Sequence, residues 1–387
     1  MSRLGDVFDL VGGGTPTTSK EEYWGRGTPW ISSADIGNNG QIVYRRKVTQ
    51  LGLTNSTTNV VPKGTVIVVT RVGLGKVAQL TEDTCFSQDI QALLARENTP
   101  EYSSSFLMYQ LLFIMQTVKY SGRGTTISGI TKKQLADVSL YLPPLPEQER
   151  IVARIEELFS KLDAGVETLK KTKAQLTVYR QAVLKEAFEI CKELVAIEAV
   201  TKHVTDGDHM PPPKAETGIP FIMISNIKGN VICWEQTAFV GREYYKNIDS
   251  KRKPQIGDVL YTVTGSYGIP VLVDYEKEFC FQRHIALLRP KDTVEQKYLY
   301  YSLMEPGVFA QATKGATGTA QKTVGLGVLR KIEIPFTADH TEQLQIVEMI
   351  ESRLSICDSI EQTVDAALQQ AEAMRQSILK VAFEGNI

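Results

Sequence analysis

The chain has few cysteines and no long hydrophobic run. Its 387 residues include five cysteines, an odd number without close spacing, which argues against a disulfide framework. No stretch approaches the eighteen or so uninterrupted apolar residues of a membrane-spanning helix. The start, Met1-Ser2-Arg3-Leu4-Gly5-Asp6, lacks the charged-then-apolar pattern of a signal peptide. These absences exclude the secreted disulfide-rich and membrane classes, and we expect a soluble, cytoplasmic protein.

The motifs of nucleotide-binding enzymes are incomplete. Gly73-Leu74-Gly75-Lys76 resembles the end of a phosphate-binding loop, but no glycine stands five residues before Gly75, and Val77 replaces the required Ser or Thr. A methyltransferase would need a Gly-rich turn for its cofactor and an Asn-Pro-Pro-aromatic motif. Leu142-Pro143-Pro144-Leu145 has neither the Asn nor the aromatic residue. We therefore expect a non-catalytic chain without a cofactor of its own.

A metal-binding pattern is also missing. Asp206, Asp208 and His209 come closest to one, and no further His or Cys lies near them in the sequence. Zinc sites need three or four ligands, whereas Asp side chains in turns commonly accept hydrogen bonds from neighbouring backbone N–H groups. We interpret residues 206–209 as a turn held by side-chain-to-backbone hydrogen bonds.

What the chain does have is an internal repeat with a fixed offset. Glu147-Gln148 returns 195 positions later as Glu342-Gln343, and the other matched pairs in this region keep the same offset. These pairs are Ile151-Val152 with Ile346-Val347, Ile155-Glu156 with Ile350-Glu351, Arg180-Gln181 with Arg375-Gln376, Leu184-Lys185 with Leu379-Lys380, and Ala187-Phe188-Glu189 with Ala382-Phe383-Glu384. A repeat that keeps its offset over about forty residues indicates a duplicated unit whose length is constrained.

The repeat continues more loosely in the remaining sequence. Pro29-Trp30-Ile31 matches Pro220-Phe221-Ile222, and Cys85-Phe86 matches Cys280-Phe281, with offsets that drift between 191 and 195. Loops tolerate insertions and packed elements do not, so each half is predicted to be one globular part followed by one rigid part. Cys85 and Cys280 are interpreted as core residues. The boundaries we assign are residues 1–146 and 195–335 for the globular parts and residues 147–194 and 336–387 for the rigid parts.

Charge is nearly balanced overall but not along the chain. The total is 43 basic and 44 acidic residues, yet the two globular parts carry net charges of +3 and +2 while residues 336–387 carry −6. A mildly basic surface leaves room for an anionic partner on the globular parts. The acidic last segment suggests a different role for that part of the chain.

The rigid parts are predicted to be two long helices. Pro143-Pro144-Leu145-Pro146 ends the preceding sheet, and acidic residues then open a helix, where the macrodipole favours them. Apolar residues follow in steps of three and four, as in a coiled-coil seam. They are Ile151, Ile155, Leu158, Leu162, Val166, Leu169, Leu176, Tyr179, Val183 and Ala187, and in the second half Ile346, Ile350, Leu354, Cys357, Ile360, Val364, Leu368, Ala371, Met374, Ile378 and Ala382. Each helix would span roughly 65 Å at about 1.5 Å per residue. We expect the two to pair antiparallel, because a globular part is threaded between them.

The globular parts are predicted to be α+β. Short apolar runs between turn residues indicate strands: Val66–Val69, Ala92–Leu94, Val138–Leu142, Val259–Tyr261, Ile285–Leu288 and Ile332–Ile334. One amphipathic helix is predicted late in each part, near residues 105–118 and 295–304.

At several of these positions the chain closely resembles the DNA-specificity subunit of type I restriction-modification systems. The residues that carry the resemblance are Leu4-Gly5-Asp6-Val7, Gly13-Gly14-Thr15-Pro16, Tyr23-Trp24, Pro29-Trp30-Ile31-Ser32, Leu142-Pro143-Pro144-Leu145-Pro146-Glu147-Gln148, Asp206-Gly207-Asp208-His209 and Ala382-Phe383-Glu384-Gly385. They span the whole chain in the family's order. The resemblance implies two target-recognition domains, each reading half of a bipartite site on double-stranded DNA, separated by two helical spacers.

The resemblance also implies partners. Such a subunit docks two modification subunits that methylate adenine and, through them, restriction subunits. S-adenosylmethionine, ATP and Mg²⁺ are then expected in the partners and not in this chain. The backbone of duplex DNA has a local dyad, so a reader of two separated half-sites benefits from two halves related by a pseudo-two-fold repeat. Divergent globular parts would allow unlike half-sites, and helices of fixed length would set the gap between them.

Candidate DNA-binding residues lie on Gly-rich loops and basic runs, because direct readout needs donors and acceptors at base edges and Lys or Arg at phosphates. In the first part they are Arg45, Arg46, Lys47, Thr70, Arg71, Lys76, Gln88, Arg123 and Thr125. In the second part they are Lys251, Arg252, Lys253, Thr264, Ser266, Tyr267, Arg283, His284, Lys314 and Thr317. Gln88-Asp89 corresponds to Arg283-His284 in the repeat, so this pair differs in chemistry between the halves, as a specificity position should. The two basic runs, residues 45–47 and 251–253, are interpreted as phosphate contacts, with plain surface as the alternative. For the loop residues the alternative is an ordinary solvated turn.

Two other functions are compatible with parts of this pattern. One is a coiled-coil scaffold whose globular parts bind protein, and a labelled duplex library that yields no enriched bipartite motif would favour it. The other is a stand-alone nuclease or methyltransferase, which the missing motifs disfavour. Methyl transfer from S-adenosylmethionine by this chain alone would support that second alternative.

Overall fold

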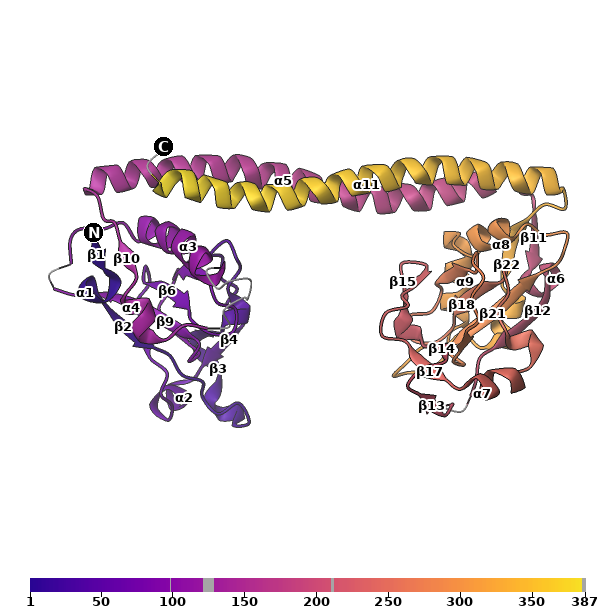
Figure 1. Cartoon of the computed structure of the whole chain (residues 1–387), viewed down its shortest axis with the longest axis horizontal. Coiled ribbons are helices and arrows are strands. Elements are labelled where there is room, and N and C mark those ends of the chain that lie inside the picture. The colour runs from indigo at the N-terminus through magenta and orange to yellow at the C-terminus, as the bar shows by residue number, and fades with distance from the viewer. Residues whose placement is uncertain (98, 121–128, 210–211, 385–387) are drawn as a thin grey trace. The chain divides into compact units, whose positions relative to one another are not determined.

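The computed structural model of the chain describes residues 1–97, 99–120, 129–209 and 212–384. The chain divides into two compact units, Met1–Leu169 with Ala366–Ile387 and Lys170–Asp365. Each unit contains one globular domain and part of each of two long helices (Figure 1). Helices and separate sheets make up both domains, which confirms the predicted α+β class. The domain boundaries assigned from the sequence remain a prediction, because each unit combines segments from both long helices.

The first domain contains two four-stranded sheets. One is antiparallel in the order β2-β9-β6-β7, formed by Phe8–Gly12, Ile90–Ala95, Val66–Val69 and Val77–Gln79. The other has the order β4-β3-β8-β5, formed by Arg46–Val48, Trp24–Ile31, Thr84–Phe86 and Val60–Val61, with β3 and β8 parallel. A short pair joins β1 (Ser2–Arg3) to β10 (Ser139–Leu140). Strand β6 is buried on both faces, because Ile67 packs in the cluster between the sheets and Val68 packs in the cluster beneath the helices.

The second domain repeats this arrangement. Its antiparallel sheet has the order β12-β21-β18-β19, formed by Thr201–Asp206, Ile285–Pro290, Val259–Thr262 and Pro270–Leu272. The mixed sheet is β13-β17-β14-β20, formed by Lys214–Ala215, Ala238–Val240, Ile219–Ile222 and Cys280–Phe281, with β14 and β20 parallel. Two small pairs complete it: β11 (Glu193–Ala196) with β22 (Glu333–Phe336) and β15 (Ile227–Lys228) with β16 (Val231–Ile232). The domains differ at the edges of the mixed sheets. The first domain has an additional strand, β5, beside β8, and the second has an additional strand, β13, beside β17.

The domain helices follow the repeat with one exception. The first domain has α1 (Leu4–Val7), α2 (Gln50–Thr54), α3 (Ser104–Tyr120) and α4 (Lys132–Ala136). The second has α6 (Ile197–Val200), α7 (Arg242–Asn247), α8 (Gln296–Ser302), α9 (Pro306–Gly315) and α10 (Leu326–Lys331). The predicted helices at 105–118 and 295–304 correspond to α3 and α8. Helix α9 was not predicted: Pro306 begins it, and the Glu305 side chain accepts the backbone N–H of Val308 at 3.0 Å as its cap.

The two long helices are equal in length and keep the offset of the repeat. Helix α5 is Leu145–Phe188 and helix α11 is His340–Phe383, each of 44 residues, with both ends 195 positions apart. Helix α5 begins two residues before the predicted start because Pro146 is accommodated in its first turn. Helix α11 begins at His340 because β22 continues to Phe336.

Ion pairs show that the helices run antiparallel in unit 2 and that they contact each other in unit 1 as well. In unit 2, three residues of α5 pair with three of α11: Lys173 with Asp365, Arg180 with Asp358 and Glu186 with Arg353, each at 2.6 Å. In unit 1, Arg375 of α11 pairs with Asp163 of α5 and lies 4.4 Å from the centre of the Phe159 ring. Residue numbers fall along one helix as they rise along the other, which confirms the predicted antiparallel coiled coil. The pairs Arg180–Asp358 and Arg375–Asp163 are themselves related by the 195-residue offset.

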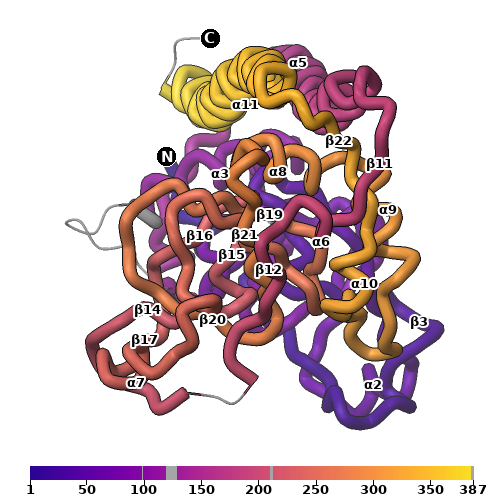
Figure 2. The backbone as a smooth tube through the Cα atoms, turned by 90° about the vertical axis from the view of Figure 1, so that its right-hand side faces the viewer, coloured from indigo at the N-terminus to yellow at the C-terminus, as the bar shows by residue number. Residues whose placement is uncertain are grey.

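Aromatic residues attach the helices to the domain of the same unit. In unit 1, Phe383 of α11 packs on Phe106 of α3, with ring centres 5.4 Å apart. In unit 2, the equivalent Phe188 of α5 packs on Tyr298 of α8, also at 5.4 Å. Figure 2 shows α8 lying between the strands of the second domain and the long helices. No helix within the described ranges has both the length and the apolar content needed to cross a bilayer.

Candidate nucleic-acid interface

The candidate site in each domain is built around one turn that follows the parallel strand pair. After β8, Ile90 N–H donates to Ser87 O at 3.2 Å, and Ser87 N–H donates to Ile31 O at 2.9 Å. After β20, Ile285 N–H donates to Gln282 O at 3.0 Å, and Gln282 N–H donates to Ile222 O at 3.0 Å. The middle residues of these turns are Gln88-Asp89 in the first domain and Arg283-His284 in the second. The correspondence predicted from the sequence is therefore present in the backbone.

A second loop lies against this turn in both domains. Gly14 N–H donates to Phe86 O at 2.8 Å, and Asp208 N–H donates to Phe281 O at 3.0 Å. The glycine before each donor has no room for a side chain, since a Cβ on Gly13 or Gly207 would lie 2.1 or 2.0 Å from the same carbonyl oxygen. Gly13-Gly14-Thr15 and Gly207-Asp208-His209 are thus equivalent loops that present different side chains.

A third loop follows β6 in the first domain and β18 in the second. Thr70 N–H donates to Asp89 O at 2.8 Å and Thr70 O accepts Ile130 N–H at 2.8 Å. In the second domain, Val263 N–H donates to His284 O at 2.9 Å and Val263 O accepts Val324 N–H at 2.8 Å. The same two hydrogen bonds therefore fix the loops 71–76 and 264–268, which confirms that the second takes the place of the first.

The basic run of the first domain is exposed. Arg45, Arg46 and Lys47 line an open depression together with Trp24 and Tyr44. Arg45 pairs with Asp35 at 3.3 Å, and the Arg46 guanidinium lies 5.7 Å from the centre of the Trp24 ring. Lys47 is exposed as well, so the run presents a concave cationic surface beside an aromatic ring.

The remaining candidates of the first domain differ in accessibility. Arg71 is exposed and lies 4.0 Å from Asp89. Lys76 is half-buried and its Nζ donates to Ser33 O at 2.9 Å. Thr70 is 4% exposed and its hydroxyl lies 3.2 Å from Asp89 O, so its side chain supports the loop from inside. The candidates Arg123 and Thr125 lie outside the described residues.

The basic run of the second domain is mostly held by its own domain. Lys251 is exposed, whereas Arg252 pairs with Asp206 at 3.3 Å and with Asp208 at 3.8 Å. Lys253 donates to Lys246 O at 3.0 Å and lies over a tyrosine ring. Of the three, only Lys251 is therefore exposed.

The turn at residues 206–209 is held differently from the prediction. Instead of backbone N–H groups, the side chains of Arg252 and Tyr244 satisfy the carboxylates, and the Tyr244 hydroxyl donates to Asp208 at 2.6 Å. Burial and the neighbouring Asp208 raise the pKa of Tyr244, so it remains a donor. His209 Nε2 lies 2.8 Å from Asp206. The prediction of side-chain-to-backbone bonds was wrong because Arg252 and Tyr244, distant in sequence, fold over the carboxylates. No group of three metal-ligating side chains occurs in the part of the chain that the structure describes.

The Gly-rich loop of the second domain meets a hairpin. Thr317 and Thr323 exchange backbone hydrogen bonds at 2.9 and 2.7 Å, and Thr323 Oγ1 lies 3.3 Å from Thr264 Oγ1. Thr264 is buried, while Ser266 and Thr317 are exposed. The predicted loop position of Lys314 is corrected, because this residue lies in the last turn of α9 and the loop begins after Gly315.

Two further side chains complete this surface. Tyr267 stacks on Phe309 of α9 with ring centres 5.8 Å apart. Arg283 is exposed, and it lines two adjoining hollows with His209 and His284. Burial, and then the charge of Arg283, lower the pKa of His284, so this imidazole is neutral at physiological pH.

Sequence reasoning missed several residues that the fold brings to these loops. Ser33 and Asp35 contact Lys76 and Arg45 from a separate turn. Tyr244 reaches Asp208 from α7. Asp35 lies four residues after the Pro29-Trp30-Ile31 repeat match, and Asn226 lies four residues after the matching Ile222, so the repeat contained a signal for one of them, whereas Tyr244 had none.

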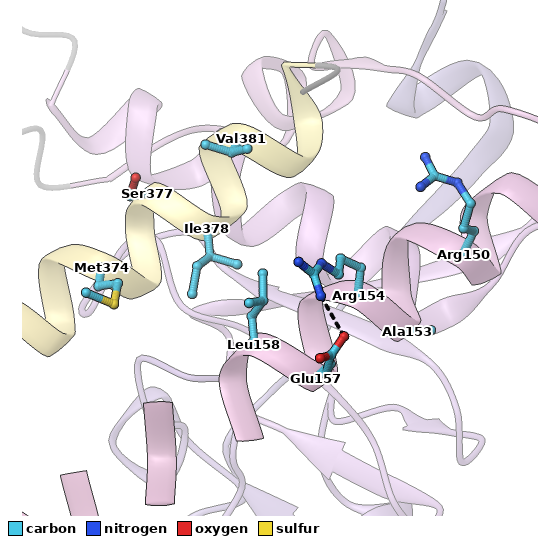
Figure 3. A pocket seen from close by; sticks show the side chains of 9 residues that line it. All are labelled: Arg150, Ala153, Arg154, Glu157, Leu158, Met374, Ser377, Ile378 and Val381. Atoms are coloured by element: carbon cyan, nitrogen blue, oxygen red, sulfur yellow. Dashed lines mark hydrogen bonds and ion pairs between the residues drawn. The ribbon is translucent and has the colours of Figure 1, made fainter. Parts of the chain in front are cut away.

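A separate surface lies on the long helices of unit 1. Arg150, Ala153, Arg154, Glu157 and Leu158 of α5 face Met374, Ser377, Ile378 and Val381 of α11 across a groove (Figure 3). Arg154 is paired with Glu157 at 2.7 Å, and Met374 and Val381 are exposed. The groove is thus lined by apolar and charged side chains together.

Comparison with known proteins gives a consistent result. The sequence model of the family described as type I restriction modification DNA specificity domain matches residues 1–177 and 193–370. The EcoBI specificity subunit of the type I restriction enzyme of Escherichia coli is 23% identical over 317 residues, covering 74% of this chain and 66% of that protein. The MjaIX specificity subunit of Methanocaldococcus jannaschii is 22% identical over 333 residues, covering 79% and 75%. This chain thus spans about two thirds to three quarters of the length of these relatives.

Solved structures share the fold over the full chain. A chain from a structure of complex assembly and conformational transition of the type I R-M system has a TM-score of 0.71 at 20% identity, covering 100% of this chain and 97% of that one. The HsdS subunit from Thermoanaerobacter tengcongensis has a TM-score of 0.51 at 20% identity, covering 100% and 96%.

Proposed function

This chain belongs to the type I restriction-modification DNA specificity family, and we propose that each of its globular domains reads one half of a bipartite, asymmetric site on double-stranded DNA. The helices α5 and α11 set the gap between the half-sites. The chain is the non-catalytic recognition subunit, and the chemistry resides in its partners.

One observation carries this proposal: the two domains hold the same three loops with the same backbone hydrogen bonds but present different side chains. Gln88-Asp89 stands where Arg283-His284 stands, and Thr15 stands where His209 stands. A common framework with divergent side chains is what two readers of unlike half-sites need. A shared catalytic site would instead require the same side chains at both places.

Phosphate contacts in the first domain would come from Arg45, Arg46 and Lys47, whose charges are exposed in a concave surface. In the second domain, the exposed cations of the candidate set are Lys251, Lys314 and Arg283, and the two lysines would contact phosphates. Contacts of this kind fix the register of a protein on duplex DNA, while the base-facing side chains supply specificity. Thr70 and Thr264 are left out of the contact set because their side chains are buried.

The helices support the spacer role by their equal length and their specific pairing. Each has 44 residues, or roughly 65 Å at about 1.5 Å per residue. Ion pairs related by the 195-residue offset hold them in one register. A fixed register gives a fixed length, which a gap-setting element requires.

The groove on α5 and α11, with its exposed Met374 and Val381, is the proposed docking surface for a modification subunit. Two such subunits would bind, and restriction subunits would join through them. S-adenosylmethionine, ATP and Mg²⁺ would be bound by these partners, in the cytoplasm.

The test is selection from a randomised duplex library by the full chain assembled with its modification subunits. We expect an enriched motif of two half-sites with a fixed gap. Failure to enrich any motif, with assembly intact, would favour the protein-binding scaffold instead. Methyl transfer by the chain alone would contradict the non-catalytic role.

The spacer role has its own test. Seven residues inserted after Lys171 and seven after Ala366, positions that are 195 apart, keep the ion pairs on either side in register. The inserted residues lengthen each helix by about 10 Å, so the gap between the two half-sites should lengthen by about three base pairs. An unchanged gap would refute the spacer role. Insertion into one helix only is the matched control, and it should disrupt pairing and lower stability.

A further inference from the structure

We infer that Gln88 and Arg283 are base-reading residues at equivalent positions, with Gln88 selecting adenine and Arg283 selecting guanine in their respective half-sites. This inference rests on the proposed function and deepens it by naming the base that each turn recognises.

The equivalence is geometric. Both residues are the second of a four-residue turn closed by the same hydrogen bond, after the same parallel strand pair. In each turn the carbonyl oxygen of the next residue accepts the N–H of the residue that follows the central strand. Asp89 O accepts from Thr70 at 2.8 Å in the first domain, and His284 O accepts from Val263 at 2.9 Å in the second. Both side chains are exposed. Two side chains mounted alike on equivalent turns should meet the same position of their half-sites.

The surroundings of Gln88 orient its amide. Thr15 Oγ1 donates to Gln88 Oε1 at 2.7 Å, so the protein holds the amide through its oxygen. Its two N–H groups have no partner among the described residues. The oxygen keeps a second lone pair. An amide held in this way can donate to purine N7 and accept from the N6 amino group, the bidentate pattern that selects adenine.

The turn that carries Arg283 contains no anionic residue. In the first domain, Asp89 follows Gln88 and lies 4.0 Å from Arg71. In the second, the equivalent of Asp89 is His284, whose pKa is lowered by burial, so no anion neighbours Arg283 in the turn. Within the described ranges its guanidinium makes no ion pair. An exposed, unpaired guanidinium donates two hydrogen bonds to O6 and N7, the pattern that selects guanine.

The experiment exchanges the two side chains in the full chain assembled with its modification subunits. Gln88→Arg should change one adenine to guanine in one half-site and leave the other half-site as in the wild type. Arg283→Gln should change one guanine to adenine in the other half-site. Each preference should be roughly 5- to 150-fold, the discrimination of a bidentate side chain–base pair.

The outcomes separate this inference from the function on which it rests. A wild-type chain that enriches no bipartite motif contradicts the proposed function itself. A wild-type motif that either exchange leaves unchanged contradicts only the base assignment. A uniform loss of affinity in Arg283→Gln, with all base preferences retained, also contradicts it, because that result indicates a phosphate contact. The control is Lys202→Gln. Lys202 lies in β12 at the end far from Asp206, and its substitution removes the same charge, so it should alter no base preference.

Discussion

The side-chain oxygen of Gln148 accepts the backbone N–H of Ser103 at 2.9 Å, and so ties the first turn of α5 to the start of α3. The Gln148 nitrogen donates to Pro143 O at 2.7 Å and to Glu101 O at 3.2 Å. The repeat-equivalent Gln343 makes the same three bonds in unit 2: it accepts from Glu295 N–H at 2.8 Å and donates to Thr337 O and Thr293 O at 2.8 and 3.3 Å. Both glutamines are fully buried. One side chain therefore joins each long helix to the domain it covers.

Gln148→Leu should destabilise unit 1 by about 3 kcal/mol, because it keeps the volume but leaves buried backbone groups unpaired. Gln343→Leu should do the same in unit 2. The free energy of unfolding is measured by urea denaturation of the full chain. Gln181→Ala, an exposed glutamine on α5, is the control and should change stability by less than about 0.5 kcal/mol. An equally small effect of Gln148→Leu would contradict the anchoring role.

Gly13→Ala and Gly207→Ala should each cost about 3 kcal/mol or more, since the added Cβ would lie 2.1 or 2.0 Å from a carbonyl oxygen of the neighbouring strand. Gly165→Ala gives the opposite expectation. It lies within α5 with no atom within 4 Å of an added Cβ, so alanine should stabilise the helix by about 1 kcal/mol. Thermal unfolding measures all three, and destabilisation by Gly165→Ala would indicate a close contact on this face of α5.

The triple variant Arg45→Ala, Arg46→Ala, Lys47→Ala should weaken binding to all duplexes alike and preserve the selected motif. The slope of log affinity against log salt concentration is negative, and its magnitude should decrease by about two to three. Each phosphate contact that is lost reduces this magnitude by about 0.9. Titrations at several salt concentrations measure this slope. Lys132→Ala with Lys133→Ala removes exposed charges on α4 and should leave the slope unchanged. A changed motif in the triple variant would show base contacts instead.

The stability of unit 2 should fall as the solution is acidified below pH 6.5. Burial, and then the charge of Arg289, lower the pKa of His203 from its usual value of 6.5, and its Nε2 is buried without a partner within the described ranges. The unfolded chain then binds a proton more readily than the folded chain, so acid favours unfolding and the full stability is present above pH 6.5. His203→Gln should flatten this dependence between pH 7.5 and 5. An unchanged slope in that variant would assign the dependence to other groups.

The elements predicted best are those whose signals are local and repeated. The apolar stripe from Ile151 to Ala187 and its copy 195 residues later predicted both long helices, and Val66–Val69 and Ile285–Leu288 predicted central strands. Helix α9 was not predicted because it begins at Pro306, and proline usually breaks a helix. Lys314 was consequently assigned to a loop.

The site was predicted at the level of loops and not of side chains. Thr70 lies at the end of an apolar strand, and only the fold shows that its side chain is buried. Arg252 was interpreted as a free cation, whereas its partners Asp206 and Asp208 lie more than forty residues away in the sequence. Pairings over such distances depend on sheet topology, which no local pattern contains.

The division of the chain into units has a consequence for its biosynthesis. Unit 2 is one continuous segment, Lys170–Asp365, whereas unit 1 needs Ala366–Ile387 to complete it. During translation the second domain and its part of the helix pair can therefore finish folding while α3 of the first domain still exposes the apolar surface that Phe383 later covers. The domain that is made first is thus the one completed last, and it is the one that premature termination within α11 would leave open to aggregation.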